Sequence, residues 1–197
     1  MFFNLVIDIM KRVFSISFML IAMNIVYAQS IPLTTDGAFE VKEVVDVDGV
    51  GAQQLYDRAM MALSRWTTSK SENNLDYHDR DAGILILKGL EYMGFKNTFM
   101  GAGWERYINY SLTVRCKDGR AQVTIVIPNI VFIYNTNGIK RILTIEELKQ
   151  LVDQSKKKRK ERGQAILSEI QIMALNFCLN MVNALKNTGS SNFDDDF

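Results

Sequence analysis

The chain has few of the residues that catalytic and metal sites commonly use. Its 197 residues include one histidine, His78, and two cysteines, Cys116 and Cys178. The sequence also has no glycine-rich phosphate loop, no nucleophile elbow and no pair of acidic residues at an informative spacing. Enzymes of the common classes leave such traces. We therefore expect a non-catalytic protein with no catalytic residues, no metal and no cofactor.

The low cysteine count excludes a disulfide scaffold as the basis of the fold. About 170 residues follow the N-terminal segment described below, and a domain of that size buries roughly 70% of its unfolded surface without covalent help. Two states stay open for the cysteine pair. An exported chain allows Cys116 and Cys178 to form one bridge, and free cysteines also occur as small core residues.

The N-terminus has the pattern of a secretory signal peptide. Lys11 and Arg12 precede the almost wholly apolar run Val13–Val26, which ends in a small-x-small sequence. This order of a basic start, a short apolar run and small residues is typical of signal peptides. The run of 14 residues is shorter than the roughly 20 that a membrane-spanning helix needs. We expect residues 1–28 to be removed, and the protein to be exported to the periplasm, the cell envelope or the exterior.

Charge gives no reason to expect a nucleic-acid partner. The whole chain has 23 basic and 22 acidic residues, and residues 1–28 contain two basic residues and one acidic residue. The chain from residue 29 onward therefore has 21 of each and no net charge. A neutral chain has no global attraction to nucleic acid.

Alternating apolar and polar residues predict an antiparallel sheet in the first two thirds of the chain. Asp118-Gly119 is a strong hairpin signal, and Pro128 predicts a bulge or an edge in the strand that returns from it. Helical spacing of apolar residues from Leu55 to Trp66 predicts one helix over residues 52–67. The predicted strands cover residues 39–47, 75–79, 84–88, 107–117, 121–127 and 130–134.

The segment Leu75–Gly83 (LDYHDRDAG) looks at first like a metal site, because it holds three aspartates and the one histidine. Strand side chains alternate, so we expect Asp76 and His78 on one face and Asp79 on the other. The last four residues have turn composition, and Gly83 is free to take a positive φ. We therefore predict a hairpin at this segment and no metal site.

The last third of the chain reads as helical. Thr144-Ile145-Glu146-Glu147 has the form of a capping box. We expect Gly163 to break or kink the helix that follows, and a second helix to cover residues 164–185. These C-terminal helices are expected to cover the second face of the sheet. Residues 187–197 are polar and acidic, and we expect a disordered tail.

The segment from Phe39 to Trp66, FEVKEVVDVDGVGAQQLYDRAMMALSRW, resembles the opening of a bacterial family of unknown function with a TATA-binding-protein-like (TBP-like) fold. The later matches are the hairpin that ends at Ala82-Gly83-Ile84, the residues Tyr110–Val114 and the turn Lys117–Arg120. The resemblance implies an exported protein of a Gram-negative bacterium. It also implies an α+β fold with an antiparallel sheet in a β-α-β-β-β-β order over residues 29–143, and one or two C-terminal helices packed on it over residues 144–186. The family brings no catalytic residues, and the name of its fold does not imply DNA binding.

One candidate binding surface is the segment from residue 90 to residue 106. Its aromatic residues are interleaved with glycines, and the segment is expected to be a long loop, which is often functional. Exposed aromatic side chains can stack on sugars or anchor a protein partner. They can equally fold back and cover the edge of the sheet. The candidate binding residues here are Tyr92, Phe95, Phe99 and Trp104.

The second candidate surface is the basic run Lys156–Arg162 (KKKRKER), of which we single out Lys156, Lys157, Lys158 and Arg159. Such a run suits anionic lipid headgroups or phosphorylated glycans. It can also be a solvated helix face near a helix C-terminus, or a partner for the acidic tail.

Together these patterns favour an exported, non-catalytic module that binds an envelope protein or a glycan, with weak contact to a membrane surface. The alternatives are a hydrolase with a dispersed site and a structural subunit of an envelope assembly.

Overall fold

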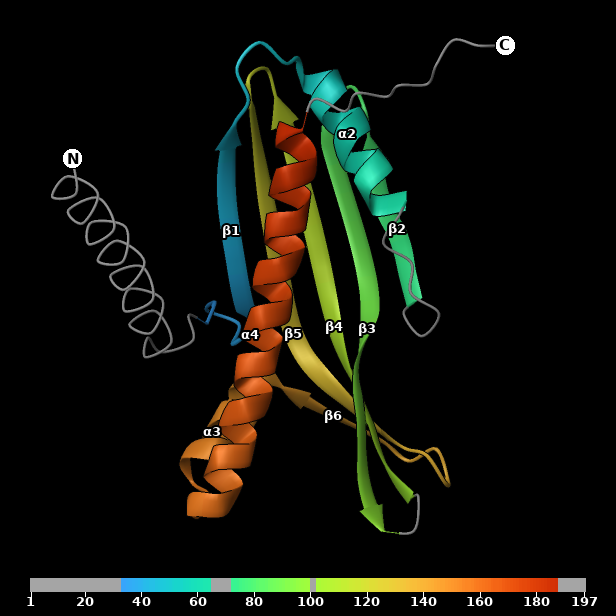
Figure 1. Ribbon diagram of the computed structural model, residues 1–197, viewed down its shortest axis with the longest axis vertical. Helices are drawn as coiled ribbons and strands as arrows, with labels where there is room; N and C mark the ends of the chain where they lie inside the picture. The colour runs from blue at the N-terminus through green and yellow to red at the C-terminus, as the bar shows by residue number, and fades with distance from the viewer. Residues whose placement is uncertain (1–32, 65–71, 100–101, 188–197) are drawn as a thin grey trace, which may run out of the picture. The chain divides into compact units, whose positions relative to one another are not determined.

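A computed structural model of the chain describes residues 33–64, 72–99 and 102–187. It has an antiparallel sheet with helices packed on it, which confirms the predicted α+β class (Figure 1). The expected signal peptide, Trp66 and all of the expected tail except Asn187 lie outside the described residues. In chain order the elements are β1 (Phe39–Asp46), α2 (Ala52–Ser64), β2 (Glu72–Asp79), β3 (Ile84–Phe99), β4 (Ala102–Lys117), β5 (Arg120–Tyr134), β6 (Lys140–Thr144), α3 (Ile145–Asp153) and α4 (Lys157–Lys186).

Strand β5 changes partners at its proline. The strand order is β1-β5-β4-β3-β2, and β6 also pairs with β5. Strand β1 pairs with β5 up to Ile127, and β6 pairs with it from Asn129 onward. Pro128, which stands between the two partners, has no N–H to donate to either. The ladder to β4 shifts register between Asn109 and Ser111, opposite this proline, so the predicted bulge is confirmed.

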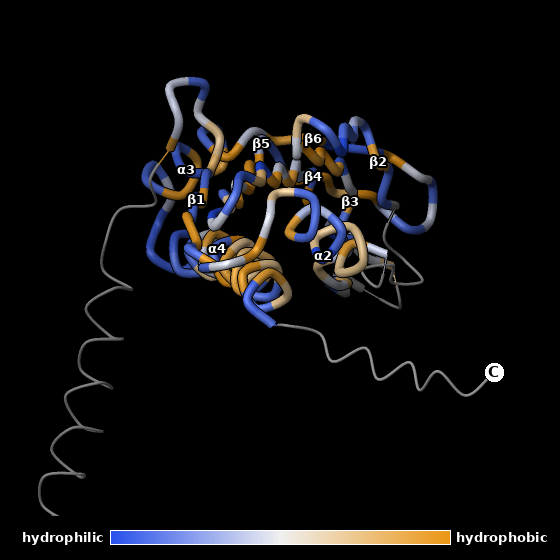
Figure 2. The backbone as a smooth tube through the Cα atoms, turned by 90° about the horizontal axis from the view of Figure 1, so that it is seen from above, coloured by the Kyte–Doolittle hydropathy of each residue, from blue (hydrophilic) through white to orange (hydrophobic). Residues whose placement is uncertain are grey.

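Helices α2 and α4 cover the same face of the sheet, as Figure 2 shows from above. The ring of Phe177 in α4 lies 5.1 Å from that of Tyr110 in β4, and α2 packs on β3, β4 and β5. The prediction that the C-terminal helices cover the opposite face is therefore wrong for α4. That face carries small polar side chains such as Thr113 and Thr124, which need no apolar cover. On the helix face, the buried residues of β4 are Ile108, Tyr110, Leu112, Val114 and Cys116, as predicted.

The two C-terminal helices meet at a glycine. The capping box of α3 is confirmed, because Thr144 Oγ1 accepts from the backbone N–H of Glu147 at 3.1 Å and Glu147 Oε2 accepts from the N–H of Thr144 at 2.8 Å. Helix α3 ends at Asp153 and residues 154–156 form a short turn. Helix α4 then runs without interruption through Gly163. The predicted break at Gly163 is wrong. A Cβ at this glycine would overlap the side chain of Val152 in α3, so the glycine allows the two helices to approach closely.

The start of α2 is held by a turn distant in sequence. Asp118, in the hairpin turn between β4 and β5, accepts a 2.8 Å hydrogen bond from the backbone N–H of Ala52 through its Oδ1. The first N–H groups of a helix have no partner within the helix, and a carboxylate is favourable there. Further along α2, Arg58 donates to the carbonyl oxygen of Leu185 in α4 at 2.7 Å. These contacts fix α2 against the sheet and against α4.

Candidate functional site

The segment LDYHDRDAG forms a hairpin between β2 and β3, as predicted, and Gly83 has a φ of 66°. The register shifts between Leu75 and Tyr77, so the expectation that Asp76 and His78 share a face is wrong. Asp76 forms an ion pair with Lys88 at 2.9 Å on one face. On the other face, His78 Nδ1 lies 3.4 Å from the hydroxyl oxygen of Tyr56 in α2.

The carboxylate of Asp79 takes part in the turn of this hairpin. Asp79 Oδ1 accepts a 2.9 Å hydrogen bond from the backbone N–H of Ala82. This backbone bond holds the pKa of the Asp79 carboxyl below its ordinary value. Within residues 33–64, 72–99 and 102–187, no group of three His, Cys, Asp or Glu side chains lies together as a metal site would need. The polar side chains of this segment therefore bond separately, Asp76 to Lys88, His78 to Tyr56 and Asp79 to the turn.

Both cysteines are free and buried. Burial raises the pKa of the Cys116 thiol to about 11. Burial, followed by the charge of Glu43, raises the pKa of the Cys178 thiol to about 11 as well. Since the thiolate is the nucleophile, neither cysteine is activated near neutral pH.

The predicted loop over residues 90–106 is wrong, because β3 and β4 continue through most of it as a long hairpin. Gly94 has a φ of 123° and lies at a register shift. Met93, which has no register partner between Tyr92 and Gly94, breaks the alternation of apolar side chains, so Tyr92 and Phe95 share a face although they are three residues apart. A pattern search with a strict period of two does not find a strand that contains such a bulge.

The aromatic residues of this hairpin do not converge on one site. Tyr92 pairs with Tyr107 at a ring distance of 5.3 Å, and Phe95 lies opposite Glu105 on the same face. Trp104 lies on the other face, where its ring is 4.9 Å from that of Tyr134. The side chain of Phe99 lies outside the described residues.

Trp104 instead helps to line a small pocket that the sequence did not predict. The cavity is about 260 Å³ and is lined by Trp104, Phe132, Arg141 and Leu143 from three neighbouring strands. Its volume is just below the roughly 300–1,000 Å³ of typical ligand pockets. The sequence analysis missed three of these residues, Phe132, Arg141 and Leu143. They lie on either side of Asn137-Gly138, a hairpin signal, and the hairpin pairs residues 129–133 with β6.

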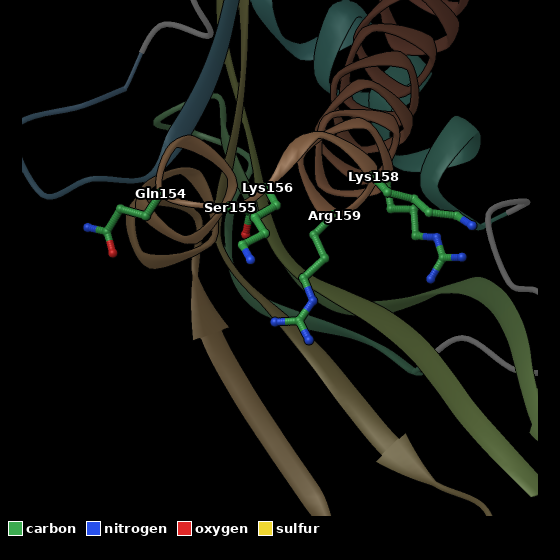
Figure 3. Close-up of a pocket in the computed structure, with 6 residues that line it drawn as sticks. Gln154, Ser155, Lys156, Lys158 and Arg159 are labelled. Carbon is green, nitrogen blue, oxygen red and sulfur yellow. The ribbon is translucent and has the colours of Figure 1, made fainter.

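The basic run lines a larger cavity where α3 meets α4. We call this cavity of about 610 Å³ the basic pocket; its lining residues are Gln154, Ser155, Lys156, Lys158, Arg159 and Arg162. Figure 3 shows Gln154, Ser155 and Lys156 on the connecting turn and Arg159 on the first turn of α4. The side chain of Lys158 extends in a different direction from that of Arg159. Of the four predicted basic residues, three line the pocket and Lys157 does not.

Most of the basic run lies at the start of α4, so its expected place near a helix C-terminus is wrong except for Lys156, which follows the C-cap of α3 by two residues. Lys156 is the N-cap residue and makes no capping hydrogen bond through its side chain, and the first turn contains no acidic residue. A helix N-terminus carries a partial positive charge, which repels these cations. None of the ion pairs among the described residues includes a member of the run. The positive charge of the basic pocket therefore has no carboxylate partner in this part of the chain.

The alternative in which the acidic tail pairs with the basic run is not tested, because residues 188–197 lie outside the described residues.

Comparison with known proteins places the fold. Residues 42–130 match the family model of a domain of unknown function (DUF4468) with a TBP-like fold. The crystal structure of a TBP-like protein from Parabacteroides distasonis is similar with a TM-score of 0.58 and 14% identity, over 80% of this chain and 97% of that chain. That of a DUF4468 family protein from Bacteroides ovatus is similar with a TM-score of 0.57 and 20% identity, over 83% and 94%. No curated protein matches the chain.

At these identities the two structures establish the fold alone. The match over residues 42–130 and the shared fold confirm the resemblance drawn from the turn and core residues, and this part of the chain is similar to the DUF4468 domain with a TBP-like fold.

Proposed function

We propose that the protein is an exported, non-catalytic module of the cell envelope that binds an anionic ligand in the basic pocket. The observation that carries this proposal is the gathering of four cationic side chains around one cavity of about 610 Å³. The N-terminal sequence pattern supports export, because it has the three parts of a signal peptide. The neutral thiols, and the hairpin LDYHDRDAG whose polar side chains have separate structural partners, support a non-catalytic role.

An anion would relieve a repulsion that is built into the fold. The cations of the basic pocket lie at the positive end of a long helix, where a negative charge is favourable by about 0.3–1 kcal/mol. Arg159 and Arg162 each carry a planar guanidinium that can hold a phosphate or carboxylate through two parallel hydrogen bonds. A cavity of this size suits a ligand as large as a phosphorylated or carboxylated sugar. The ligand class we propose is therefore a glycan or small molecule with phosphate or carboxylate groups.

Titration calorimetry with two probes tests this function. Sodium pyrophosphate supplies a compact phosphate anion, and a heparin-derived oligosaccharide supplies an anionic glycan. The double variant Arg159→Gln, Arg162→Gln should bind at least one of these probes at least ten times more weakly than the unmodified protein. Affinity should also fall as salt concentration rises, because the contacts are charged.

A matched control removes the same number of charges elsewhere. Lys42 and Lys117 are exposed residues of β1 and β4, so the double variant Lys42→Gln, Lys117→Gln should keep the original affinity. Equal weakening in the two double variants would show that net charge, and not the basic pocket, attracts the anion. Absence of binding to both probes would also contradict the proposal.

A further inference from the structure

The smaller pocket on the sheet shares no residue with the basic pocket. We call this cavity of about 260 Å³ the tryptophan pocket; its lining residues are Trp104, Phe132, Arg141 and Leu143. Figure 1 shows the ends of the β3–β4 and β5–β6 hairpins, to which most of these residues belong, reaching away from the helices. Arg141 is exposed and the other three residues are half-buried, so a small molecule can reach the pocket.

Strand register brings the four side chains to one face of the sheet. Phe132 lies directly opposite Arg141 across the β5–β6 ladder, and Leu143 follows Arg141 by two residues. In β4 the partner of Phe132 is Arg106, and Trp104 precedes Arg106 by two residues. Residues two apart in a strand share a face, as do residues directly opposite each other in neighbouring strands. The pairing of three strands therefore builds the tryptophan pocket.

The wall that Trp104 forms is fixed by its neighbours. The centroid of its ring lies 4.9 Å from that of Tyr134, its direct partner in β5. Next to it, the backbone N–H of Gly103 donates to Asn135 Oδ1 at 2.9 Å, and the carbonyl oxygen of Gly103 accepts from the N–H of Asn135 at 3.0 Å. Trp104 is thus held in place without a ligand, so less ordering is needed when one binds.

No side chain that lines the tryptophan pocket can accept a hydrogen bond. Phe132 and Leu143 have no polar group, and Trp104 and Arg141 only donate. The hydroxyl hydrogens of a sugar would lose their acceptors on entering such a pocket, which is unfavourable. A carboxylate only accepts, and the guanidinium of Arg141 can hold it through two parallel hydrogen bonds. The lining therefore suits an apolar ring that carries a carboxylate.

Arg141 supplies a charge that the rest of the fold leaves available. It forms no ion pair with another residue in the ranges 33–64, 72–99 and 102–187. Arg106, on the same face, differs because Glu169 neutralises it at 2.8 Å. An anionic ligand in the tryptophan pocket would therefore be complementary to Arg141.

We propose that the tryptophan pocket binds an aromatic carboxylate, with the ring against Trp104 and Phe132 and the carboxylate on Arg141. An apolar cavity of about 150 Å³ is enough to hold benzene, so the cavity here, of about 260 Å³, admits one such ring and a short side chain. This is a second site, separate from the anion site of the proposed function. A free aromatic acid and the last residue of a peptide both have this chemistry.

NMR titration of the Trp104 indole N–H tests the inference. The variant Trp66→Phe leaves Trp104 as the one tryptophan of the chain and serves as the background protein. In it, 3-phenylpropionate should shift the indole signal at millimolar concentration, as suits so small a ligand. This acid should bind at least about five times more tightly than the neutral 3-phenylpropanamide, which lacks the charge that Arg141 recognises.

Two further ligands define the class. Methyl β-D-glucuronide combines a sugar ring with a carboxylate, and it should bind at least about five times more weakly than 3-phenylpropionate because its hydroxyl groups lose their partners. N-acetyl-L-phenylalanine has the form of a peptide end. Tighter binding than that of 3-phenylpropionate supports the proposal with a peptide end as the source, and weaker binding supports it with a free acid.

Two matched pairs of variants assign the binding to the tryptophan pocket. Arg141→Gln should abolish the preference for the acid over the amide, whereas Arg115→Gln, at an exposed arginine on the opposite face of β4, should keep it. Leu143→Gln should weaken both ligands about fivefold, because it places a polar group in the apolar wall. Ile142→Gln, at the next residue and on the opposite face, should leave both affinities unchanged. Circular dichroism checks that each variant is folded.

Four results would overturn the inference. The first is a Trp104 signal that 3-phenylpropionate does not shift. The second is equal affinity for the acid and the amide, or a preference that survives Arg141→Gln. The third is methyl β-D-glucuronide binding as tightly as 3-phenylpropionate, which would make the ligand a sugar. The fourth is a dimer in analytical ultracentrifugation that Leu143→Gln abolishes, which would make a second copy the occupant.

The two binding sites can fail independently. The double variant Arg159→Gln, Arg162→Gln should bind 3-phenylpropionate as the background protein does, because neither arginine lines the tryptophan pocket. Arg141→Gln should likewise keep its affinity for pyrophosphate. Loss of 3-phenylpropionate binding in the Arg159→Gln, Arg162→Gln variant would contradict the separation of the two sites.

Discussion

Arg106 of β4 and Glu169 of α4 form an ion pair of 2.8 Å that joins the sheet to the long helix. The two side chains differ in burial, with 14% of Arg106 exposed and 46% of Glu169. Arg106 Nε is buried and has no hydrogen-bond partner among the described residues. Glu169 is therefore the main compensation for taking this guanidinium out of water.

Removal of the Glu169 charge should destabilise the fold measurably. We expect Glu169→Gln to lower the free energy of unfolding by about 1 kcal/mol, because it leaves a mostly buried guanidinium without its carboxylate, while the exposure of Glu169 keeps the effect modest. Urea denaturation measures this. Asp46→Asn breaks the pair with Arg120, in which both side chains are 63% exposed, and should change stability by less than about 0.5 kcal/mol. Equal effects would show that burial of Arg106 has no energetic consequence.

The contact between Gly163 and Val152 predicts an unusual response to a helix-favouring substitution. Replacement of glycine by alanine within a helix normally raises the free energy of unfolding by about 1 kcal/mol. Gly163→Ala should instead destabilise by about 1 kcal/mol, because the new methyl group overlaps Val152 and overpacking typically costs about 1–3 kcal/mol. Adding Gly163→Ala to a Val152→Ala background should be neutral or stabilising. The four proteins form a double-mutant cycle in urea, and a coupling near zero would exclude the contact.

Charge reversal at the start of α4 should stabilise the fold and weaken anion binding. Lys158→Glu replaces a repelled cation with a favourable anion and should raise the free energy of unfolding by about 0.5 kcal/mol. Lys186→Glu, in the last turn of the same helix, should lower it by a similar amount. Thermal unfolding at low salt measures both changes, and high salt should reduce them. The Lys158→Glu variant should also bind pyrophosphate more weakly, and a stabilised variant with unchanged affinity would separate the helix start from the basic pocket.

The buried thiols predict a loss of stability at alkaline pH. Cys116 and Cys178 have a pKa of about 11 in the fold, against an ordinary value of 9.0. The stability that they add to the fold is fully present below pH 9. As pH rises from about 9 to 11, the free energy of unfolding falls by up to roughly 1.4 kcal/mol per pH unit for each thiol. Burial also raises the pKa of the Tyr110 hydroxyl, which adds its own loss at the upper end. The variant Cys116→Ala, Cys178→Ala should therefore show a shallower decline than the unmodified protein between pH 9 and 11, and equal slopes would mean that the thiols do not titrate differently on folding.

Local patterns were sufficient to predict most of the sheet. Ile108 to Cys116 alternate without interruption, and the Asp118-Gly119 turn leads into an equally regular strand, so period and turn chemistry agree. The capping box at Thr144 was also visible, because its two hydrogen bonds join residues three apart. Features that depend on neighbouring residues in sequence were thus read correctly.

The misses share a different physical cause. The bulges at Met93 and Asp76 each insert a residue that shifts the alternation by one, and a strict period of two fails there. Gly163 has the composition of a helix end, but its role is to admit Val152 from another helix, which no local window contains. The face of the sheet that α4 covers is likewise determined by tertiary packing and not by local sequence.

The candidate site was predictable only in part. The basic run is conspicuous as KKKRKER, but its electrostatic effect depends on which end of a helix it occupies. The turn at residues 154–156, which the sequence did not predict, places it at the start of α4. The aromatic residues were equally conspicuous, yet the register placed Tyr92 and Trp104 on opposite faces. Composition identified which residues carry chemistry, and the backbone decided which of them meet.

Helix α4 keeps its charges near its two ends. Between Arg162 and Lys186 its one charged side chain is Glu169, which is ion-paired with Arg106. About 36 Å of helix separates Arg162 from Lys186, more than four Debye lengths at physiological salt. An anion held in the basic pocket therefore does not sense the charge of Lys186, and the two ends of the helix act on charged ligands independently of each other.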